Sequence, residues 1–425
     1  MKISHIRITP LAFKDPPLLN AIGVHGPYAL RSVLQVTGDN GLQGLGETYG
    51  DPATVTLLEQ IAPRLIGLDV FDLRSVHSIV TDCVRTLGQT ADDSCVLAPE
   101  TDPTRTLSVA YAAFEVALLD LQARSVGLPL ADFLGGRVRD RVPFSGYLFF
   151  KYARHVEGLY ADDRWGELLD AEQLVGAAER MVEQYGFGSL KLKGGVLEPA
   201  RELECMRALR QRFPQLPLRI DPNGNWSVPV ALRVAQESAG LLEYLEDPCP
   251  TLEQMAEVHR ETGALLATNM VVTRMDQFRD NAATQGAQVI LADHHYWGGL
   301  RETQALARMC EVFGWGLSMH SNSHLGISLM AMAHVAASIP NLSYACDTHY
   351  PWLDPNEQVV QGGHIRFDRG AIAIGDRPGL GVEIDEQRLQ ALHRQYLEAG
   401  SVGRDDAAQM RKYDPNWEGR VPRFA

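Results

Sequence analysis

The sequence predicts an α/β protein built around a parallel (β/α)8 barrel. Seven polar residues recur at intervals of 23 to 29 residues, each after a short apolar run and before a loop and a helix-like stretch. One βα unit occupies roughly 30 residues, so this period fits successive barrel strands. The active site of such a barrel lies at the C-terminal ends of its strands. The seven residues expected there are Lys193, Asp221, Glu246, Asn269, Asp293, His320 and His349.

The length requires more than a barrel. The chain has 425 residues, which is too many for one ordinary compact domain. A barrel of about 250 residues plus a second domain accounts for it. We expect an α+β domain over residues 1–130, the barrel over 131–375 and a C-terminal segment over 376–425.

Charge and targeting signals limit the class of function. A net charge of −14 argues against a nucleic-acid surface, although a buried site could still be locally cationic. The six cysteines are scattered without a CxxC pair, which is typical of reduced thiols in the cytoplasm. The first residues lack the apolar core of a signal peptide. We expect no membrane span, because the apolar runs fall short of roughly 18 residues.

The N-terminal region reads as strands followed by helices. Apolar and polar residues alternate over 2–8, 29–36 and 41–47, which predicts half-buried antiparallel strands. Helical patterns follow at 52–66 and 106–124. The second of these is very apolar, as expected for a helix buried on several sides.

The barrel elements come next. Several expected strands are apolar until their last residue, as strands covered on both faces should be. Amphipathic stretches, for example 199–212 and 301–313, separate them, and a last helix is expected at 386–398. The expected strands are 142–150, 189–193, 218–221, 242–246, 264–269, 288–293, 316–320 and 342–347.

Three oxygen ligands lie on successive strand ends, namely Asp221, Glu246 and Asn269. Taken singly, Asp-Pro-Asn-Gly and Glu-Asp-Pro are more often turns. All three at the barrel period favour a cation, because such oxygens are costly to bury without one. Carboxylate and amide oxygens suit Mg²⁺. The sequence therefore predicts one Mg²⁺ site.

Two lysines alternate in Lys191-Leu192-Lys193, so both ammonium groups should face the barrel interior. An isolated pair of this kind is more often a solvent-facing strand end. Inside a barrel mouth, the two charges should lower each other's proton affinity. That effect would favour one lysine as a general base.

Asp293 and His320 lie one strand apart. A carboxylate bonded to one imidazole nitrogen fixes the tautomer and raises the basicity of the other nitrogen. A structural buried histidine is the alternative, but the polar run His320-Ser321-Asn322-Ser323-His324 favours catalysis. Lys193 and His320 would then face each other across the metal. This set suits proton abstraction beside a carboxylate and expulsion of a β-hydroxyl as water.

Weaker candidates surround this set, each of which is singly more often a surface or turn residue. Five lie at or beside strand ends and could hydrogen-bond a polyhydroxylated substrate: Tyr147, Asn223, Ser321, Asn322 and His349. Three lie in N-terminal loops that could cover the mouth: Asn20, His25 and Thr101. Arg404 lies near the C-terminus.

The combined motifs resemble the enolase superfamily, and within it the glucarate dehydratases of the mandelate-racemase-like branch. They read LKLKGGVL, RIDPNGNW, YLEDPCP, ATNM, LADHHYW, HSNSHLGIS and DTHYPW. PPLLNAIGVHGPYALRS and GRDDAAQM extend the resemblance into both terminal parts. It implies an α+β capping domain over a modified (β/α)7β barrel, with the C-terminal segment returning to the cap.

The resemblance also implies roles. Mg²⁺ would bind Asp221, Glu246 and Asn269. Lys193 and His320 would be the acid/base pair. Lys191 and Asn223 would assist catalysis, and Asp293 would pair with His320. The substrate-binding set would be Asn20, His25, Thr101, Tyr147, Lys191, Asn223, Ser321, Asn322, His349 and Arg404. The implied reaction is dehydration of D-glucarate, with L-idarate as a second substrate, to 5-dehydro-4-deoxy-D-glucarate. The partner would be this small acid sugar, and we expect a homo-oligomer, as is common for soluble enzymes.

Two segments depart from the family pattern, namely 151–170 and 294–299. Both are expected near the barrel mouth, where a substrate is selected. One alternative is therefore a dehydratase or epimerase for another acid sugar with the same catalytic residues. The other is a catalytically silent relative that acts as a binding subunit, although every metal and acid/base position is intact.

Overall fold

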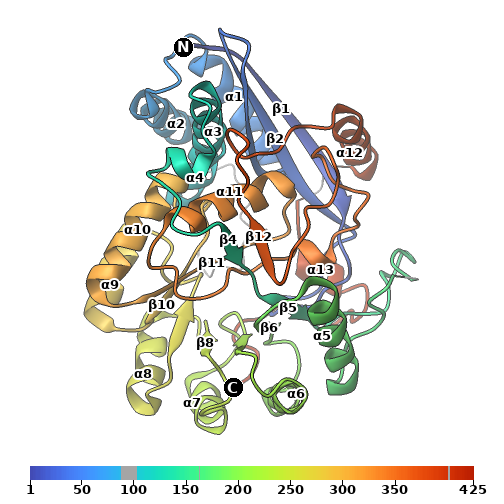
Figure 1. Ribbon diagram of the computed structural model, residues 1–425. Coiled ribbons are helices and arrows are strands. Elements are labelled where there is room, and N and C mark those ends of the chain that lie inside the picture. The colour runs from blue at the N-terminus through green and yellow to red at the C-terminus, as the bar shows by residue number, and fades with distance from the viewer. Residues whose placement is uncertain (88–102, 162, 401–402) are drawn as a thin grey trace.

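The computed structural model describes residues 1–87, 103–161, 163–400 and 403–425. Its N-terminal part is a three-stranded antiparallel sheet in the order β1-β2-β3, with helices packed on one face (Figure 1). Its elements are β1 (Ile3–Lys14), β2 (Tyr28–Gly38), β3 (Gln43–Tyr49), α1 (Pro52–Leu65), α2 (Leu73–Leu87), α3 (Pro103–Ser125) and α4 (Leu130–Phe133).

Two small residues set the distance between β3 and α3. A Cβ atom on Gly44 would lie 2.0 Å from the Ala117 carbonyl oxygen, and one on Gly46 would lie 2.4 Å from that of Ala113. Any larger residue at either position would push the helix off the sheet. The two glycines of the strand therefore let helix and sheet pack directly against each other.

Helix α3 has a further property. Its window Arg105–Ser125 is long and apolar enough, by length and composition alone, to cross a membrane. However, 83% of that window is buried inside the protein. The apolar surface of the helix is covered by its own domain, as in the core helix of a globular domain.

A curled parallel sheet of seven strands follows, in the order β11-β10-β9-β8-β7-β6-β5. Its strands are β5 (Gly146–Phe149), β6 (Leu190–Lys193), β7 (Leu218–Asp221), β8 (Tyr244–Glu246), β9 (Leu266–Thr268), β10 (Val289–Ala292) and β11 (Gly316–Met319). A helix follows each strand: α5 (Ala171–Tyr185), α6 (Pro199–Arg212), α7 (Val228–Glu237), α8 (Leu252–Thr262), α9 (Met275–Thr284), α10 (Leu300–Phe313) and α11 (Gly326–Ser338).

An irregular segment takes the eighth position. Residues 342–347 form no regular strand, contrary to the expectation. Asp347 N donates to Met319 O of β11 at 2.8 Å, and Cys346 N donates to Pro143 O at 2.9 Å. The segment thus lies between the last parallel strand and the chain that leads into β5. It closes the barrel, as the predicted (β/α)7β architecture requires.

The first expected barrel strand is also divided. Residues 142–150 form β4 (Arg141–Pro143) and β5, and β4 pairs instead with β12 (Ala371–Ala373) in a separate two-stranded sheet. The six other predicted barrel strands agree with the structure to within two residues at each end, whereas β1 runs six residues beyond the predicted end at residue 8. The predicted helices at 52–66, 106–124, 199–212, 301–313 and 386–398 correspond to α1, α3, α6, α10 and α12 (Glu386–Ala399).

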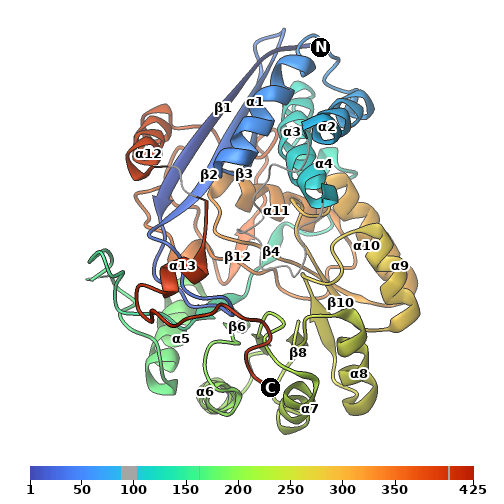
Figure 2. The ribbon, with the colours of Figure 1, turned by 180° about the vertical axis from the view of Figure 1, so that it is seen from behind.

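The C-terminal part returns to the cap, as expected. Helix α12 packs against β1, and Figure 1 shows it beside that long strand. After α13 (Asp406–Met410) the tail runs along the barrel (Figure 2). Trp226 pairs with Phe424 there, and Arg423 N donates to Asn225 Oδ1 at 2.7 Å. The tail therefore binds the loop after β7. The domain limits at 130 and 375 stay predictions.

Candidate active site

The predicted metal ligands lie together at one end of the barrel. Asp221 ends β7, Glu246 ends β8 and Asn269 follows β9, and all three are buried. Carboxylate oxygens of Asp221, Glu246 and Asp247 lie within 4.8 Å of one another. Asn269 Nδ2 donates to Glu246 Oε1 at 3.1 Å, so the amide reaches the same cluster.

The donor chemistry of this cluster fits Mg²⁺. Burial first, and then the charge of Asp221, raise the pKa of Glu246 well above its usual range. A divalent cation between the two carboxylates would relieve that repulsion. All the available ligand atoms are oxygens, which Mg²⁺ prefers. Rotation of the Asn269 amide would turn its oxygen, in place of its nitrogen, towards the ion.

Asp247 was missed by the sequence interpretation, which assigned only Glu246 of the Glu-Asp-Pro motif to the site. Its Oδ1 accepts from the Thr268 hydroxyl at 2.5 Å, and its Oδ2 accepts from Asn269 N at 3.0 Å. Both oxygens are thus engaged by the segment that carries Asn269. We conclude that Asp247 orients this ligand through its backbone, the way outer carboxylates commonly hold metal ligands in place.

The two lysines of β6 point into the same cluster. Lys193 Nζ donates to Asp221 Oδ2 at 2.6 Å. Lys191 Nζ donates to Glu246 Oε1 at 2.6 Å and to Asp347 Oδ2 at 2.7 Å. Both are buried, which agrees with strand alternation.

The prediction that the two lysines lower each other's proton affinity is wrong for Lys191. Burial by itself disfavours the Lys191 ammonium, but Asp347 and Glu246 outweigh it and hold the pKa of Lys191 well above its usual range. Opposite charges at about 2.6 Å dominate over a like charge on the same strand. Lys191 is thus a fixed cation. Asp347, which the sequence interpretation did not assign to the site, is one of the residues that make it so.

Asp221 is ionised for the same reason. Burial works against its charge, but Lys193 and Lys191 hold the pKa of Asp221 well below its usual range. Tyr147 adds a third contact, since its hydroxyl donates to Asp221 Oδ2 at 3.1 Å. The backbone N–H of Asn223 donates to the other oxygen, Oδ1, at 3.0 Å. Asn223 has a φ of 52°, a left-handed conformation that Asn tolerates better than most residues.

The predicted Asp293–His320 contact is present. His320 Nδ1 lies 3.1 Å from Asp293 Oδ2. His295, which sequence reasoning missed, lies 2.8 Å from Asp293 Oδ1 through its own Nδ1. Burial opposes the charged carboxylate, but His295 and His320 together hold the pKa of Asp293 well below its usual range. Asp293 is therefore an ionised group shared by two imidazoles.

His349 lies near both catalytic candidates. Its ring packs at 5.0 Å against both Tyr147 and Phe149. Burial lowers the pKa of His349 well below its usual value, and the charges of His25, His320 and Lys193 lower it further. His349 is therefore a neutral imidazole packed between aromatic rings.

Three predicted substrate residues lie in the terminal parts of the chain. His25 Nδ1 lies 2.9 Å from Asp15 Oδ2. Asn20 Nδ2 donates to Asp406 Oδ2 at 2.6 Å, and Arg404 pairs with the same carboxylate at 2.5 Å. The N-terminal loop and the C-terminal segment are thus joined at Asp406, which sequence reasoning did not identify.

Of the remaining predicted substrate residues, two make hydrogen bonds within the protein. Ser321 Oγ donates to Asp347 O at 3.3 Å. Asn322 Nδ2 donates to the hydroxyls of Tyr296 and Tyr49 at 2.6 and 2.9 Å, so its amide nitrogen is used within the protein. Thr101 lies outside the described residues.

A cavity of about 760 Å³ lies apart from this cluster, between α2, α3 and the loops after β9 and β10. Tyr296 and Glu115 are in its wall, but the metal-ligand and lysine residues are not. We place the active site at the buried charges, because the groups that could do chemistry gather there.

Comparisons with known proteins show the family of the chain. Residues 7–135 match the N-terminal domain family of mandelate racemase and muconate lactonizing enzyme, and residues 173–388 match the enolase C-terminal domain-like family. The chain belongs to the enolase superfamily. The prediction that it resembles this superfamily, and that it is an enzyme, is confirmed.

The similarity to individual members of the superfamily extends over the whole chain. A probable glucarate dehydratase of Streptomyces coelicolor is 47% identical, covering 100% of this chain and 99% of that protein. A crystal structure of an enolase from Pseudomonas fluorescens Pf0-1, with bound magnesium, potassium and tartrate, is 55% identical with a TM-score of 0.97, covering 100% and 99% of the two chains. An enolase from Thermobispora bispora, complexed with magnesium and formate, is 47% identical with a TM-score of 0.96, covering 99% of each chain. The magnesium in both structures agrees with the predicted cofactor.

Proposed function

We propose that this enolase-superfamily enzyme is a magnesium-dependent acid-sugar dehydratase, a hydro-lyase. The favoured substrate is D-glucarate, with L-idarate as a second one, and the product is 5-dehydro-4-deoxy-D-glucarate. The observation that carries the proposal is that Lys193 and His320, at or just after the ends of two strands of the same parallel sheet, are each bonded to an ionised carboxylate. The whole-length similarity to a probable glucarate dehydratase supports the choice of substrate. Tartrate, a hydroxylated diacid, in the Pseudomonas fluorescens relative supports an acid-sugar ligand.

In this mechanism Asp221, Glu246 and Asn269 would hold Mg²⁺, which would supply positive charge next to the substrate carboxylate. Lys193 removes the proton next to that carboxylate as a general base. Lys191 stays cationic and stabilises the negative charge that develops, because Asp347 and Glu246 fix its ammonium in place. Tyr147 and Asn223 hold Asp221 in position beside the base.

His320 acts on the other side of the substrate. Its Nδ1 faces Asp293, so its Nε2 is the nitrogen that is directed at the substrate. In the protonated form, Nε2 donates a proton to the leaving hydroxyl, which departs as water. His25, His349, Ser321 and Arg404 are proposed to hold the distal hydroxyl and carboxylate groups. We also propose a cytoplasmic homo-oligomer with no nucleic-acid or membrane partner.

The test is a screen of the purified protein with Mg²⁺ against a panel of acid sugars, with detection of the keto product. Turnover of D-glucarate that is lost with EDTA supports the proposal. Turnover of another acid sugar alone favours the second candidate, a dehydratase or epimerase of different specificity. That outcome would point to the loop over 151–170. Silence across the panel with bound metal demonstrated would favour a non-catalytic binding subunit.

A further inference from the structure

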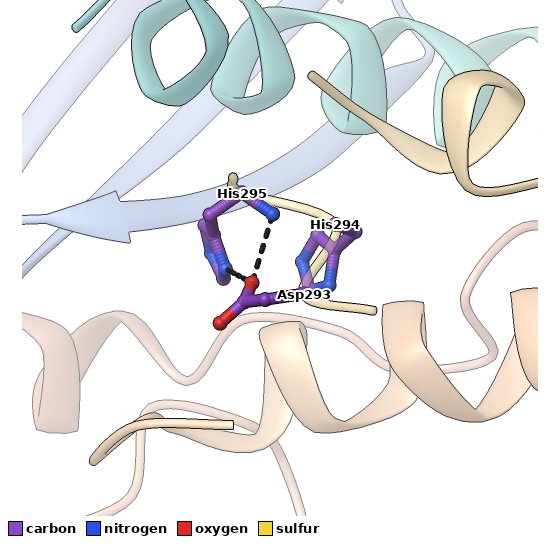
Figure 3. A group of neighbouring side chains, drawn as sticks. All are labelled: Asp293, His294 and His295. Carbon is purple, nitrogen blue, oxygen red and sulfur yellow. Dashed lines mark hydrogen bonds and ion pairs between the residues drawn. The ribbon is translucent and has the colours of Figure 1, made fainter. Parts of the chain in front are cut away.

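The group formed by Asp293, His294 and His295 has the composition of a second metal site. Each presents a possible ligand atom, and these atoms lie within 4.8 Å of one another. The hydrogen bonds point to a different role. Figure 3 draws two contacts from Asp293 to His295, from its Nδ1 and from its backbone nitrogen, and none to His294.

Both carboxylate oxygens of Asp293 are engaged by hydrogen-bond donors. Oδ1 lies 2.8 Å from His295 Nδ1 and accepts from His295 N at 2.9 Å. Oδ2 lies 3.1 Å from His320 Nδ1. An ionised carboxylate only accepts hydrogen bonds, so both imidazoles must carry a proton on Nδ1. A metal on this group would have to displace the proton from His295. The contacts therefore describe a carboxylate held from two sides.

The far side of the His295 ring reaches the cap. Its Nε2 lies 3.1 Å from Arg31 Nη2 and 3.3 Å from Ser328 Oγ, which are donors for a neutral imidazole. The same Nε2 lies 3.1 Å from Glu47 O, which is an acceptor for a protonated one. Arg31 Nε in turn donates to Glu47 Oε1 at 3.0 Å. The ring is held in either protonation state by strands β2 and β3.

We propose that His295 is a positioning residue for the reaction, which binds Oδ1 of Asp293 and thereby directs Oδ2 to His320. Through this bond, the cap strands fix the rotamer of Asp293, and Asp293 fixes the tautomer of His320. The inference rests on the proposed function for the role of His320. It goes beyond that function because it assigns the orientation of the catalytic acid to a histidine that does not contact it and to the cap.

The charged and titratable groups around His295 come from several elements. The cap supplies a buried ion pair and a tyrosine, the loop after β10 supplies two groups, and the segment after β11 supplies two imidazoles. They are Arg31, Glu47, Tyr49, Asp293, His294, His320 and His324. Loss of the His295 bond leaves the full charge of Asp293 facing His320, which should make His320 more basic.

Two amide substitutions separate the two sides of the ring. In His295→Asn the amide nitrogen takes the place of Nδ1 and can still donate to Asp293. In His295→Gln it takes the place of Nε2 and reaches Arg31 and Glu47 instead. His295→Phe keeps the ring volume and removes both contacts.

We expect His295→Gln and His295→Phe to lower kcat about 10- to 100-fold with KM unchanged, and His295→Asn to stay close to wild type. The kcat profile of His295→Gln should also move to higher pH by about one unit. A merely structural role would lower the profile without displacing it. The proposal would be overturned if His295→Gln kept the wild-type kcat, or if kcat fell by the same factor in all three variants.

A second readout does not depend on turnover. In ¹⁵N NMR of the histidine-labelled full-length protein, with His320→Gln for assignment, wild-type His320 should be the Nδ1-protonated tautomer. His295→Gln should show a mixture of tautomers, and His295→Asn should not. An unchanged tautomer in His295→Gln would refute the positioning role even if no acid sugar is turned over. Failure of the substrate screen alone would refute only the proposed function.

Discussion

Lys191 Nζ and Asp347 Oδ2 lie 2.7 Å apart, although their residues are 156 positions apart in the chain. Lys191 lies on the second strand of the parallel sheet, and Asp347 ends the irregular segment that closes the barrel. Both side chains are fully buried. This ion pair therefore depends on barrel closure, and it keeps one cation permanently beside the proposed metal ligands.

Lys193→Ala and His320→Ala should each abolish turnover and leave the fold intact. A general acid or base typically raises the rate of a reaction by about 10²- to 10⁴-fold, so each variant should lose at least about 100-fold in kcat. Exchange of the α-proton of a glucarate-configured substrate in D₂O, followed by NMR, separates the two roles. Exchange that persists in Lys193→Ala would exclude it as the base. Lys412→Ala is the matched control, because that lysine pairs with Glu157 at the surface.

Asn269→Ala should weaken Mg²⁺ binding, measured by titration calorimetry, because it removes one of three protein ligands. Thr268→Val is the control on the same segment. It removes the hydroxyl that donates to Asp247 at 2.5 Å and accepts from Met270 N and Val271 N. The metal ligand itself stays, so the effect should be smaller, of about 10-fold. If Asn269→Ala bound Mg²⁺ like the wild type, Asn269 would leave the ligand set. Asp247 would then be the third candidate.

Acid should destabilise the protein partly through His334 on α11. Burial lowers the pKa of His334 to about 4, and its Nδ1 accepts from Ala131 N at 3.0 Å. The unfolded chain binds this proton near pH 6.5. The stability from neutral His334 is therefore complete above pH 6.5 and is lost as the pH falls towards 4. At pH 5 the loss amounts to about 2 kcal/mol.

Chemical denaturation at pH 7 and pH 5 tests this on wild type and His334→Asn. The amide oxygen of Asn can accept from Ala131 N without titrating. Its free energy of unfolding should thus fall less between the two pH values. Other buried histidines, such as His324, keep some pH dependence in the variant. An identical pH dependence in both proteins would show that His334 does not contribute.

His155 should affect substrate binding, because it supports the N-terminal loop from the segment over 151–170. Its Nε2 lies 2.8 Å from Asp15 O, and Asp15 Oδ2 lies 2.9 Å from His25 Nδ1. We expect His155→Ala to raise KM for the acid sugar more than it changes kcat. Glu157→Gln, an exposed change on the same loop, is the control. If both variants had the same KM as the wild type, this loop would have no role in substrate binding.

The sequence could predict most of the fold because barrel strands can be recognised from local sequence patterns. The run Leu218–Asp221 is short, contains two aliphatic residues and ends in an acid, and it is strand β7 without change. Residues 342–347 carry a similar pattern, but their backbone bonds go to two different segments, to Met319 O and to Pro143 O. This choice of partners depends on the tertiary structure and cannot be read from a local sequence pattern.

The same limit applies to the active site. Residues at the strand period, such as Lys193 and Asp293, could be found because the period places them in space. Asp247 and His295 could not, since they lie one and three residues past a strand end and each acts by supporting another group. Their roles are revealed only by the hydrogen bonds that they make across the fold. Asp406 was missed for the same reason, although Arg404 two residues earlier was identified.

The bond between the tail and the loop after β7 has a consequence for biosynthesis. Residues 423 and 424 join this segment to the loop that carries Asn223, and α12 covers β1 of the cap. Until the chain has emerged from the ribosome as far as residue 424, the loop beside Asp221 lacks this partner. The nascent chain should therefore stay inactive until this segment has emerged.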